Sequence, residues 1–351
     1  MNPIEFSPNY AVGEGRPCFI IAEVGINHNG DEQLAAEMIA SAAEAGADCV
    51  KFQNYITEDF ISDKAQQYSY TSAGKEVSES MYGMFKRYEI DRDFIGHLKQ
   101  TCDQHGVIFT STPTSQSGID DLVKSGAPLL KNGSDYLTNL DIITQMGETG
   151  LPTVISCGMA TLAEIERAVT TFHATGNMDL ILLHCTSSYP TPPEDVHLRK
   201  METLKSVFDL PVGLSDHTDG IVAGCLAASM GACIIEKHFT TDKNLEGPDH
   251  SFSCDPQELT ELVTAIRTAE KMLGTQKLGP TQGENSSRAE YRLSCVSNAD
   301  LPAGHILTEH DISFKRPGTG VPPSSKKYLI NRRLKLPVAQ NTILTLDQFD
   351  S

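Results

Sequence analysis

Residues 212–238 read VGLSDHTDGIVAGCLAASMGACIIEKH, and they contain two short apolar runs separated by one longer segment. Val212–Ser215 and Ile234–His238 have the length and apolar content of buried strands, whereas Asp219–Met230 is long enough to form a helix. A strand, a helix and a strand in this order predict two parallel strands joined by a crossover helix.

The same pattern repeats outward from this stretch toward both ends of the chain. We predict further strands at Phe19–Val24, Cys49–Gln53, Val107–Thr112, Pro128–Lys131, Thr153–Cys157 and Leu180–Cys185, and helices at Glu32–Ala45, Arg92–His105, Leu162–Thr175 and Pro256–Leu273. Eight βα units over residues 18–274 match the usual barrel length of about 250 residues. The predicted fold class is therefore α/β, a (β/α)8 TIM barrel. A doubly wound open sheet, the main alternative, normally has fewer strands and a glycine-rich turn after the first.

Four segments lie outside the regular pattern. Residues 54–91, which we call the insertion, form a connection far longer than the usual 2–6 residues on the face where barrel active sites lie. We predict a lid or substrate loop there, with an insertion of no function as the alternative. Residues 1–17 are an N-terminal extension, residues 275–287 have the composition of a linker, and residues 288–351 form a small C-terminal domain. Because about 60 residues give only a marginal core, this domain is expected to pack on its own barrel or on a partner subunit.

The overall composition excludes several classes of protein. The formal net charge is −18, which argues against nonspecific binding of nucleic acid. No run approaches ~18 apolar residues, and no signal peptide follows Met1, so we expect neither a membrane span nor secretion. The nine cysteines form no Cys-x-x-Cys pair, which favours reduced thiols in a cytoplasmic protein. An anionic substrate would have to bind to a local cluster of basic groups.

Polar residues gather where each predicted strand ends. The groups are Glu23 with residues 25–30, Lys51 with Gln53, then residues 110–113, 131–135, 156–158, 184–190, 215–217 and 236–238. Parallel barrel strands bring these ends together, so Lys51 and Lys131 should point at one site beside the hydroxyls of Thr112, Ser134, Ser156 and Ser215. Ammonium groups ringed by hydroxyls suit a phosphate or carboxylate. Either lysine alone would be interpreted as a surface side chain.

Two histidines and one carboxylate add chemistry to this site. His217 and His238 end neighbouring strands, which lie ~4.8 Å apart, so they can share a divalent metal with water, substrate or Asp249. The alternative is a pair of structural histidines. Glu23 is positioned for proton transfer, and a buried salt bridge to Lys51 is its simpler interpretation.

Together, these segments resemble the N-acetylneuraminate synthase family, which includes synthases of legionaminic and pseudaminic acids. The similar segments are Ile21–Gly30, Val50–Gln53, Lys131–Ser134, His184–Pro190, Gly213–Thr218, Glu236–Phe239 and Gly247–His250. The tail segment Lys315–Gly320 resembles the family's C-terminal antifreeze-like (SAF) domain.

The resemblance implies a reaction. Phosphoenolpyruvate would condense with the open-chain aldehyde of an N-acyl hexosamine-type sugar, N-acetylmannosamine or 2,4-diacetamido-2,4,6-trideoxymannose. The products would be a nonulosonic acid and phosphate, with C–O cleavage. The likeness also implies a domain-swapped homodimer.

Roles for single residues follow from the same resemblance. Phosphoenolpyruvate would be bound by Lys51, Thr112, Lys131, Ser134, Ser156, Ser187 and Ser215. The metal, Mn²⁺ with Mg²⁺ or Co²⁺ as alternatives, would be bound by His217 and His238. The sugar would contact Gln53, Tyr189 and Asp249, with Arg316 reaching in from the C-terminal domain of a second subunit. The catalytic groups would be Glu23, His217 and either Asp135 or Tyr136.

One departure from the family pattern concerns the proton donor. Members of the family carry an acidic residue two positions after the Gly-Ser serine, where this chain has Tyr136 preceded by Asp135. Either residue could take the role. Three other functions remain as alternatives: another phosphoenolpyruvate-dependent 3-deoxy-ulosonate synthase, a Schiff-base aldolase using Lys131, and a non-catalytic sugar- or ice-binding protein.

Overall fold

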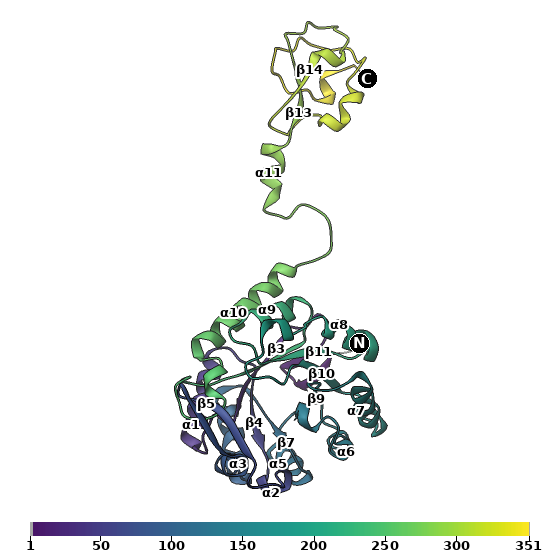
Figure 1. Ribbon diagram of the computed structural model, residues 1–351. Helices are drawn as coiled ribbons and strands as arrows, with labels where there is room; N and C mark the ends of the chain where they lie inside the picture. Colours follow the sequence, from purple (N-terminus) through teal and green to yellow (C-terminus); the bar gives the residue numbers. More distant parts are fainter. Residues whose placement is uncertain (1–2, 351) are drawn as a thin grey trace. The chain divides into compact units, whose positions relative to one another are not determined.

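The computed structural model describes residues 3–350. The chain divides into two compact units, Met1–Gly274 and Thr275–Ser351 (Figure 1). Within residues 3–350, no helix has the length and the apolar content that a membrane span requires.

The first unit is built around one sheet of eight parallel strands, in the order β7-β4-β3-β12-β11-β10-β9-β8 (Figure 1). The strands are β3 (Phe19–Gly25), β4 (Cys49–Asn54), β7 (Ile108–Pro113), β8 (Leu130–Asn132), β9 (Thr153–Ser156), β10 (Leu180–Cys185), β11 (Val212–Asp216) and β12 (Ile234–His238). Where β7 approaches β8, the Thr110 hydroxyl donates to the Leu129 carbonyl at 2.9 Å. The sheet is a nearly closed barrel, which confirms the predicted fold class.

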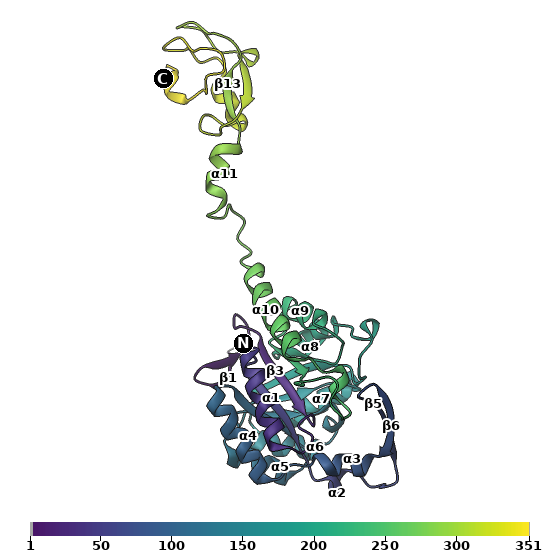
Figure 2. The same ribbon diagram turned by 90° about the vertical axis from the view of Figure 1, so that its left-hand side faces the viewer.

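Helices follow the strands and cover the outside of the barrel (Figures 1 and 2). They are α1 (Glu32–Glu44), α4 (Arg92–His105), α5 (Gln116–Ser125), α6 (Leu140–Glu148), α7 (Leu162–Ala174), α8 (Lys200–Phe208), α9 (Val222–Ser229) and α10 (Pro256–Leu273). Helix α10 starts with a capping box between Asp255 and Glu258. Helix α9 starts three residues later than predicted, because Gly220 has a φ of 71°, which a helix cannot include.

The N-terminal extension is folded. Strands β1 (Ile4–Ser7) and β2 (Tyr10–Val12) form an antiparallel hairpin. Its buried side chains Ile4, Phe6 and Val12 pack on the apolar residues that start the barrel strands, and the rings of Phe6 and Phe19 lie 5.0 Å apart. The hairpin therefore closes the N-terminal end of the barrel.

The insertion is also folded. It comprises α2 (Thr57–Phe60), a hairpin of β5 (Gln67–Ser72) and β6 (Lys75–Ser80), and α3 (Met81–Tyr88) (Figure 2). Glu89 joins its two ends by accepting hydrogen bonds from the backbone N–H of Thr57 at 3.0 Å and from the Thr57 hydroxyl at 2.8 Å. The hairpin is held to the loop after β12, where the Gly247 N–H donates to the Ser72 hydroxyl at 3.0 Å. These contacts give the insertion a defined position.

The second unit has a small core of its own. Its elements are α11 (Glu284–Tyr291) and the antiparallel pair β13 (Ser294–Ser297) and β14 (Ile312–Lys315). The buried side chains include Cys295, Leu301, Leu307, Leu329, Leu334, Leu344 and Phe349. Helix α11 begins inside the predicted linker, because Glu284 accepts hydrogen bonds from the Thr281 N–H and hydroxyl at 2.7 and 2.9 Å.

Short 3₁₀ helices complete both units: η1 (Ser134–Tyr136), η2 (Pro193–Asp195), η3 (His250–Phe252), η4 (Glu309–Asp311), η5 (Pro323–Tyr328) and η6 (Leu346–Gln348).

Candidate active site

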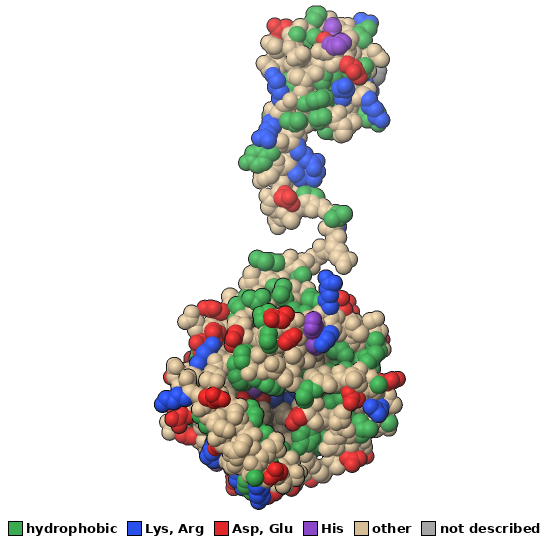
Figure 3. Space-filling view, in the orientation of Figure 1, with side chains coloured by type: hydrophobic (Ala, Val, Ile, Leu, Met, Phe, Trp, Pro, Cys, Tyr) green, Lys and Arg blue, Asp and Glu red, His purple; other side chains and the backbone are tan. Residues whose placement is uncertain are grey.

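The C-terminal ends of the strands surround a cavity of about 580 Å³, a usual size for a ligand site. Figure 3 shows the hollow in the surface of the barrel unit. Most of the predicted site residues line this cavity: Glu23, Lys51, Gln53, Thr112, Lys131, Ser134, Asp135, Tyr136, Ser156, Ser187, Tyr189, Ser215, His217 and His238. The structure thus brings together residues from all eight strand ends or the loops that follow them.

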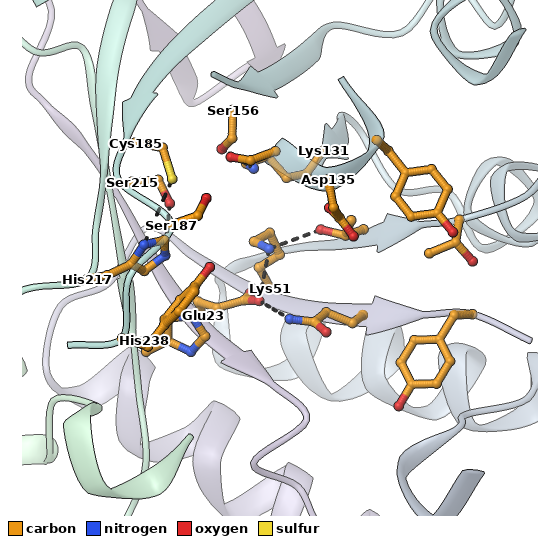
Figure 4. Close-up of a pocket in the computed structure, with 18 of the residues that line it drawn as sticks. Glu23, Lys51, Lys131, Asp135, Ser156, Cys185, Ser187, Ser215, His217 and His238 are labelled. Carbon is orange, nitrogen blue, oxygen red and sulfur yellow. Dashed lines mark hydrogen bonds and ion pairs between the residues drawn. The ribbon is translucent and has the colours of Figure 1, made fainter. Parts of the chain in front are cut away.

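The two predicted lysines are buried and differ in their surroundings (Figure 4). The Lys51 ammonium lies 2.9 Å from Glu23 Oε1 and donates to Thr112 at 3.0 Å. The Lys131 ammonium donates to Ser156 at 2.6 Å. Burial lowers the pKa of Lys131, whereas for Lys51 the effect of burial is outweighed by Glu23 and the pKa rises. Both lysines present ammonium protons to the cavity.

Glu236 connects the two lysines, and sequence analysis did not include it among the site residues. Its Oε2 atom lies 3.8 Å from the Lys51 ammonium and 3.7 Å from that of Lys131. Its Oε1 atom accepts a hydrogen bond from Ser215 at 2.9 Å. Burial raises the pKa of Glu236, but the two lysines prevail and the pKa is lowered. The signal was available, because Glu236 stands two residues before His238 and therefore faces the same side of its strand.

Glu23 forms the buried ion pair with Lys51 that was its simpler interpretation, and its role in proton transfer stays a prediction. Its Oε1 atom pairs with Lys51 and accepts from the Gln53 amide at 3.0 Å, while its Oε2 atom is buried with no hydrogen-bond partner among the described residues. Burial raises the pKa of this carboxyl, in spite of the nearby ammonium. Glu23 is therefore both an ion-pair partner and a carboxyl that keeps its proton to a higher pH than an exposed glutamate does.

His217 and His238 are neighbours in the wall of the cavity, and the centroids of their rings lie 5.4 Å apart. His217 Nδ1 lies 2.9 Å from the Thr186 carbonyl, which can only accept, so in the neutral ring Nε2 carries the free lone pair. His238 Nδ1 is buried without a hydrogen-bond partner in the described residues, and Asp249 Oδ2 lies 3.9 Å from it. Burial and His217 lower the pKa of His238, which keeps its ring neutral. For His217, burial lowers the pKa, but Cys185 and the Thr186 carbonyl outweigh it and the pKa is raised. In its neutral form each ring has the chemistry of a metal ligand.

These residues do not form a complete metal cage. Among residues 3–350, no group of three or more histidine, cysteine, aspartate or glutamate side chains is arranged to hold a metal ion. A metal bound by the two histidines would need further ligands from water or a substrate, as open catalytic sites do.

Two hydroxyls and the proton-donor candidates lie above strands β8 to β10. The Gly158 N–H donates to Ser134 Oγ at 3.0 Å, and Ser187 Oγ is buried and unpaired within residues 3–350. A Cβ atom on Gly158 would lie only 2.4 Å from Ser187 Oγ and 2.7 Å from Ser134 Oγ, so glycine lets both hydroxyls approach. Asp135 and Tyr136 are neighbours in η1, and both line the cavity.

Two predicted residues do not line the cavity of the first unit. Asp249 lies behind His238, where burial raises its pKa to about 7. Arg316 belongs to the second unit, where its guanidinium lies 5.3 Å from the ring centre of Tyr291. The role of Arg316 stays a prediction.

One side of the cavity is lined by residues of the insertion that were not predicted individually from the sequence. Tyr55, Phe60, Met81 and Phe85 of the insertion line it, and we call these four side chains the apolar wall. Tyr68 and Cys185 line it as well. The insertion was predicted to serve the site, but its individual contacts depend on how it folds over the barrel.

The fold and its polar cavity define an enzyme built on a barrel. Residues 38–278 match the model of the NeuB family, and residues 294–350 match the SAF domain. The chain therefore belongs to the NeuB family. The expected enzyme class, a transferase that forms a carbon–carbon bond, is confirmed.

Named relatives match most or nearly all of the chain. It is 39% identical to the N,N'-diacetyllegionaminic acid synthase of Legionella pneumophila, covering 97% of this chain and 96% of that protein. It is 34% identical to the human N-acetylneuraminate-9-phosphate synthase, covering 99% and 97%. The solved N-acetylneuraminic acid synthetase of Leptospira borgpetersenii has a TM-score of 0.74 and 36% identity, covering 82% of this chain and 95% of that one.

Proposed function

We propose that this enzyme condenses phosphoenolpyruvate with the aldehyde of an N-acyl hexosamine-type sugar to give a nonulosonic acid and phosphate. The names of its relatives support an acid product of this class. The observation that carries the proposal is the pair of buried ammonium groups of Lys51 and Lys131, joined through Glu236 at 3.8 and 3.7 Å. A binding protein for a neutral sugar has no use for two buried ammonium groups.

The lysines and hydroxyls form the phosphoenolpyruvate end of the site. Lys131 already has Ser156 as a partner at 2.6 Å, so the two groups are positioned before any ligand enters. Ser187 Oγ, buried and unpaired among the described residues, is a free donor toward an anion. Donors fixed in advance hold the phosphate and stabilise the negative charge that grows as it leaves.

His217 and His238 would hold a divalent metal, Mn²⁺ with Mg²⁺ or Co²⁺ as alternatives. The Nδ1 atom of His238, unpaired among the described residues, fits this role, and so does the Nε2 atom of His217 in the neutral ring, which lies 3.5 Å from Ser215 Oγ. When bound, the ion would polarise the aldehyde oxygen as a Lewis acid.

The reaction balances with the groups present. C3 of the enol attacks the aldehyde carbon, a carbon–carbon bond forms, and the aldehyde oxygen takes up a proton. Water adds to C2, and the bond from C2 to the bridging oxygen breaks to release phosphate and leave a keto acid. Glu23, which lines the cavity and whose pKa is raised by burial, would exchange these protons, with Asp135 or Tyr136 as the second donor.

The second unit would complete the site in a domain-swapped homodimer. Arg316 is exposed on that unit, and a guanidinium can bind the polar groups of a sugar with several hydrogen bonds. The small core of the unit supports the same arrangement, since about 60 residues give little stability alone.

Phosphate release from phosphoenolpyruvate tests the proposal. The protein should release phosphate with Mn²⁺ and N-acetylmannosamine or 2,4-diacetamido-2,4,6-trideoxymannose, and a chelator should stop the release until metal is added back. Release only with a phosphorylated aldose would support another 3-deoxy-ulosonate synthase. Borohydride trapping of pyruvate on Lys131 would support the aldolase alternative instead.

A further inference from the structure

The two sides of the cavity have opposite chemistry. The strand ends contribute ammonium, carboxylate, imidazole and hydroxyl groups, whereas the apolar wall contributes three aromatic rings and one thioether, all from the insertion. Tyr68, also of the insertion, lines the cavity beside these four and adds a phenol hydroxyl. We therefore expect a substrate that fills the cavity to be polar at one end and mainly apolar at the other.

The apolar wall is held in one arrangement. The rings of Tyr55, Phe60 and Phe85 meet edge to face, with centroid distances of 5.3, 5.4 and 5.1 Å. The Tyr55 hydroxyl donates to the Phe85 carbonyl at 3.1 Å, so its polar atom already has a partner. The wall consequently presents carbon atoms to a ligand, in a shape that exists before the ligand binds.

The charged side chains of the insertion lie elsewhere. Lys86 pairs with Glu58 and Glu89 at 3.1 and 3.0 Å, and Arg87 pairs with Glu79 at 2.6 Å. None of these five residues is among those that line the cavity. A hydroxyl or phosphate placed against the wall would lose its water and gain no ionic partner there.

The wall and the two histidines lie on different parts of the cavity rim. Tyr55 directly follows β4, and β4 is separated from β11, which precedes His217, by β3 and β12. Around the ring of eight strands, β11 lies three steps from β4, and β12, which ends in His238, lies two steps from it. On β4, Lys51 and Gln53 face the cavity below Tyr55, about 7 Å apart along the strand. A sugar whose aldehyde lies at the histidines thus extends its far end, C6, toward the wall.

We propose that the apolar wall binds C6 of the sugar and selects a 6-deoxy sugar, which ends in a methyl group, over a 6-hydroxy or 6-phosphorylated sugar. This inference rests on the proposed function, because the aldehyde fixes the direction of the chain. A methyl group gains from burial against carbon, and a hydroxyl on an apolar surface is disfavoured by about 10- to 100-fold. The phosphate of a 6-phosphorylated sugar adds charge without a partner on the wall.

Matched sugars test this selection in the wild-type enzyme. N-acyl mannosamine-type sugars that differ only at C6, as methyl, hydroxymethyl or phosphate, are compared by kcat/KM for phosphate release. We expect the methyl sugar to exceed the hydroxymethyl sugar by about 10- to 100-fold, with the phosphate poorest. Equal values, or a preference for the phosphate, would overturn this inference alone. Release with none of the sugars would overturn the proposed function and this inference with it.

Variants of the wall sharpen the result. Phe60→Asn should reduce the methyl-to-hydroxymethyl ratio by about 10-fold or more and leave the KM for phosphoenolpyruvate unchanged, while Phe60→Leu retains the ratio. Tyr82→Asn is the matched control, since Tyr82 belongs to the same insertion and is not among the cavity-lining residues. Should Phe60→Asn fail to fold, Met81→Asn, at the first residue of α3, makes the same test at a half-buried position. An unchanged ratio in a folded asparagine variant would contradict the assignment.

Discussion

The barrel has two layers of inward-facing side chains on the same strands. The floor is the apolar layer near the starts of the strands, and the top is the polar layer at their C-terminal ends. Pairs of residues two positions apart face the barrel interior, the first in the apolar floor and the second in the cavity. They are Ile21 and Glu23, Cys49 and Lys51, Leu129 and Lys131, Val154 and Ser156, Leu183 and Cys185, and Ile234 and Glu236.

This comparison separates stability from function. A floor residue gains about 1.5–3 kcal/mol by burial, and the hairpin of β1 and β2 covers it from below. A buried charge above it costs free energy unless it is paired, and the ion pairs among Glu23, Lys51, Glu236 and Lys131 reduce that cost. Because burying these charged side chains still costs free energy, we expect them to serve the reaction and not the stability of the fold.

The largest effect is expected at the top. His217→Ala should lower kcat by at least about 1,000-fold, because it removes a predicted metal ligand and with it several kcal/mol of transition-state stabilisation. Phosphate release under saturating substrate measures this, with His310→Ala, an exposed histidine of the second unit, as control. Full activity in His217→Ala would remove the metal assignment.

Ile181→Ala should show the opposite behaviour in the floor. Ile181 is completely buried in β10, so its truncation should lower the free energy of unfolding by about 2–5 kcal/mol. The activity of the protein that remains folded should stay near that of the wild type. Denaturant titration and phosphate release measure the two quantities. A loss of kcat without a loss of stability would show that the floor and the top are not separate.

Arg316→Ala tests a residue of the second unit, which belongs neither to the floor nor to the top of the barrel. If Arg316 reaches the sugar from a second subunit, its loss should raise the KM of the sugar roughly 10- to 100-fold, the value of a hydrogen bond to a charged group. The KM of phosphoenolpyruvate should change much less. Equal losses for both substrates would argue against the swapped arrangement, and Arg332→Ala, in the same unit, is the control.

The smallest effect is a pH dependence of stability. His28 is buried against the rings of Phe52 and Phe94, and burial lowers its pKa to about 4. The unfolded chain binds this proton at about pH 6.5. The contribution of His28 is therefore complete above that pH and is lost as the pH falls toward 4.

His28→Asn should remove this part of the pH dependence. Between pH 7 and pH 5 the wild type should lose about 2 kcal/mol more unfolding free energy than the variant. Asparagine can still accept the hydrogen bond that His28 Nδ1 receives from the Gly30 N–H at 3.0 Å. Parallel curves for the two proteins would show that His28 does not carry the effect.

The strands could be predicted because each is a short apolar run that ends in polar residues. This pattern is visible in a few consecutive residues and does not depend on the rest of the fold. The N-terminal hairpin was missed because Ile4, Phe6 and Val12 have meaning only against the floor that they cover. Glu236 was missed because its role depends on two lysines from other strands. The start of α9 was misplaced because the φ of Gly220 is set by the turn before the helix.

The measurement that tests the central claim most directly uses phosphoenolpyruvate labelled with ¹⁸O at the bridging oxygen, together with Mn²⁺ and the 6-deoxy diacetamido sugar. We predict that mass spectrometry finds the label in the released phosphate and detects a nine-carbon keto acid without it. Retention of the label in the acid, or release of phosphate without a nine-carbon product, would contradict the account.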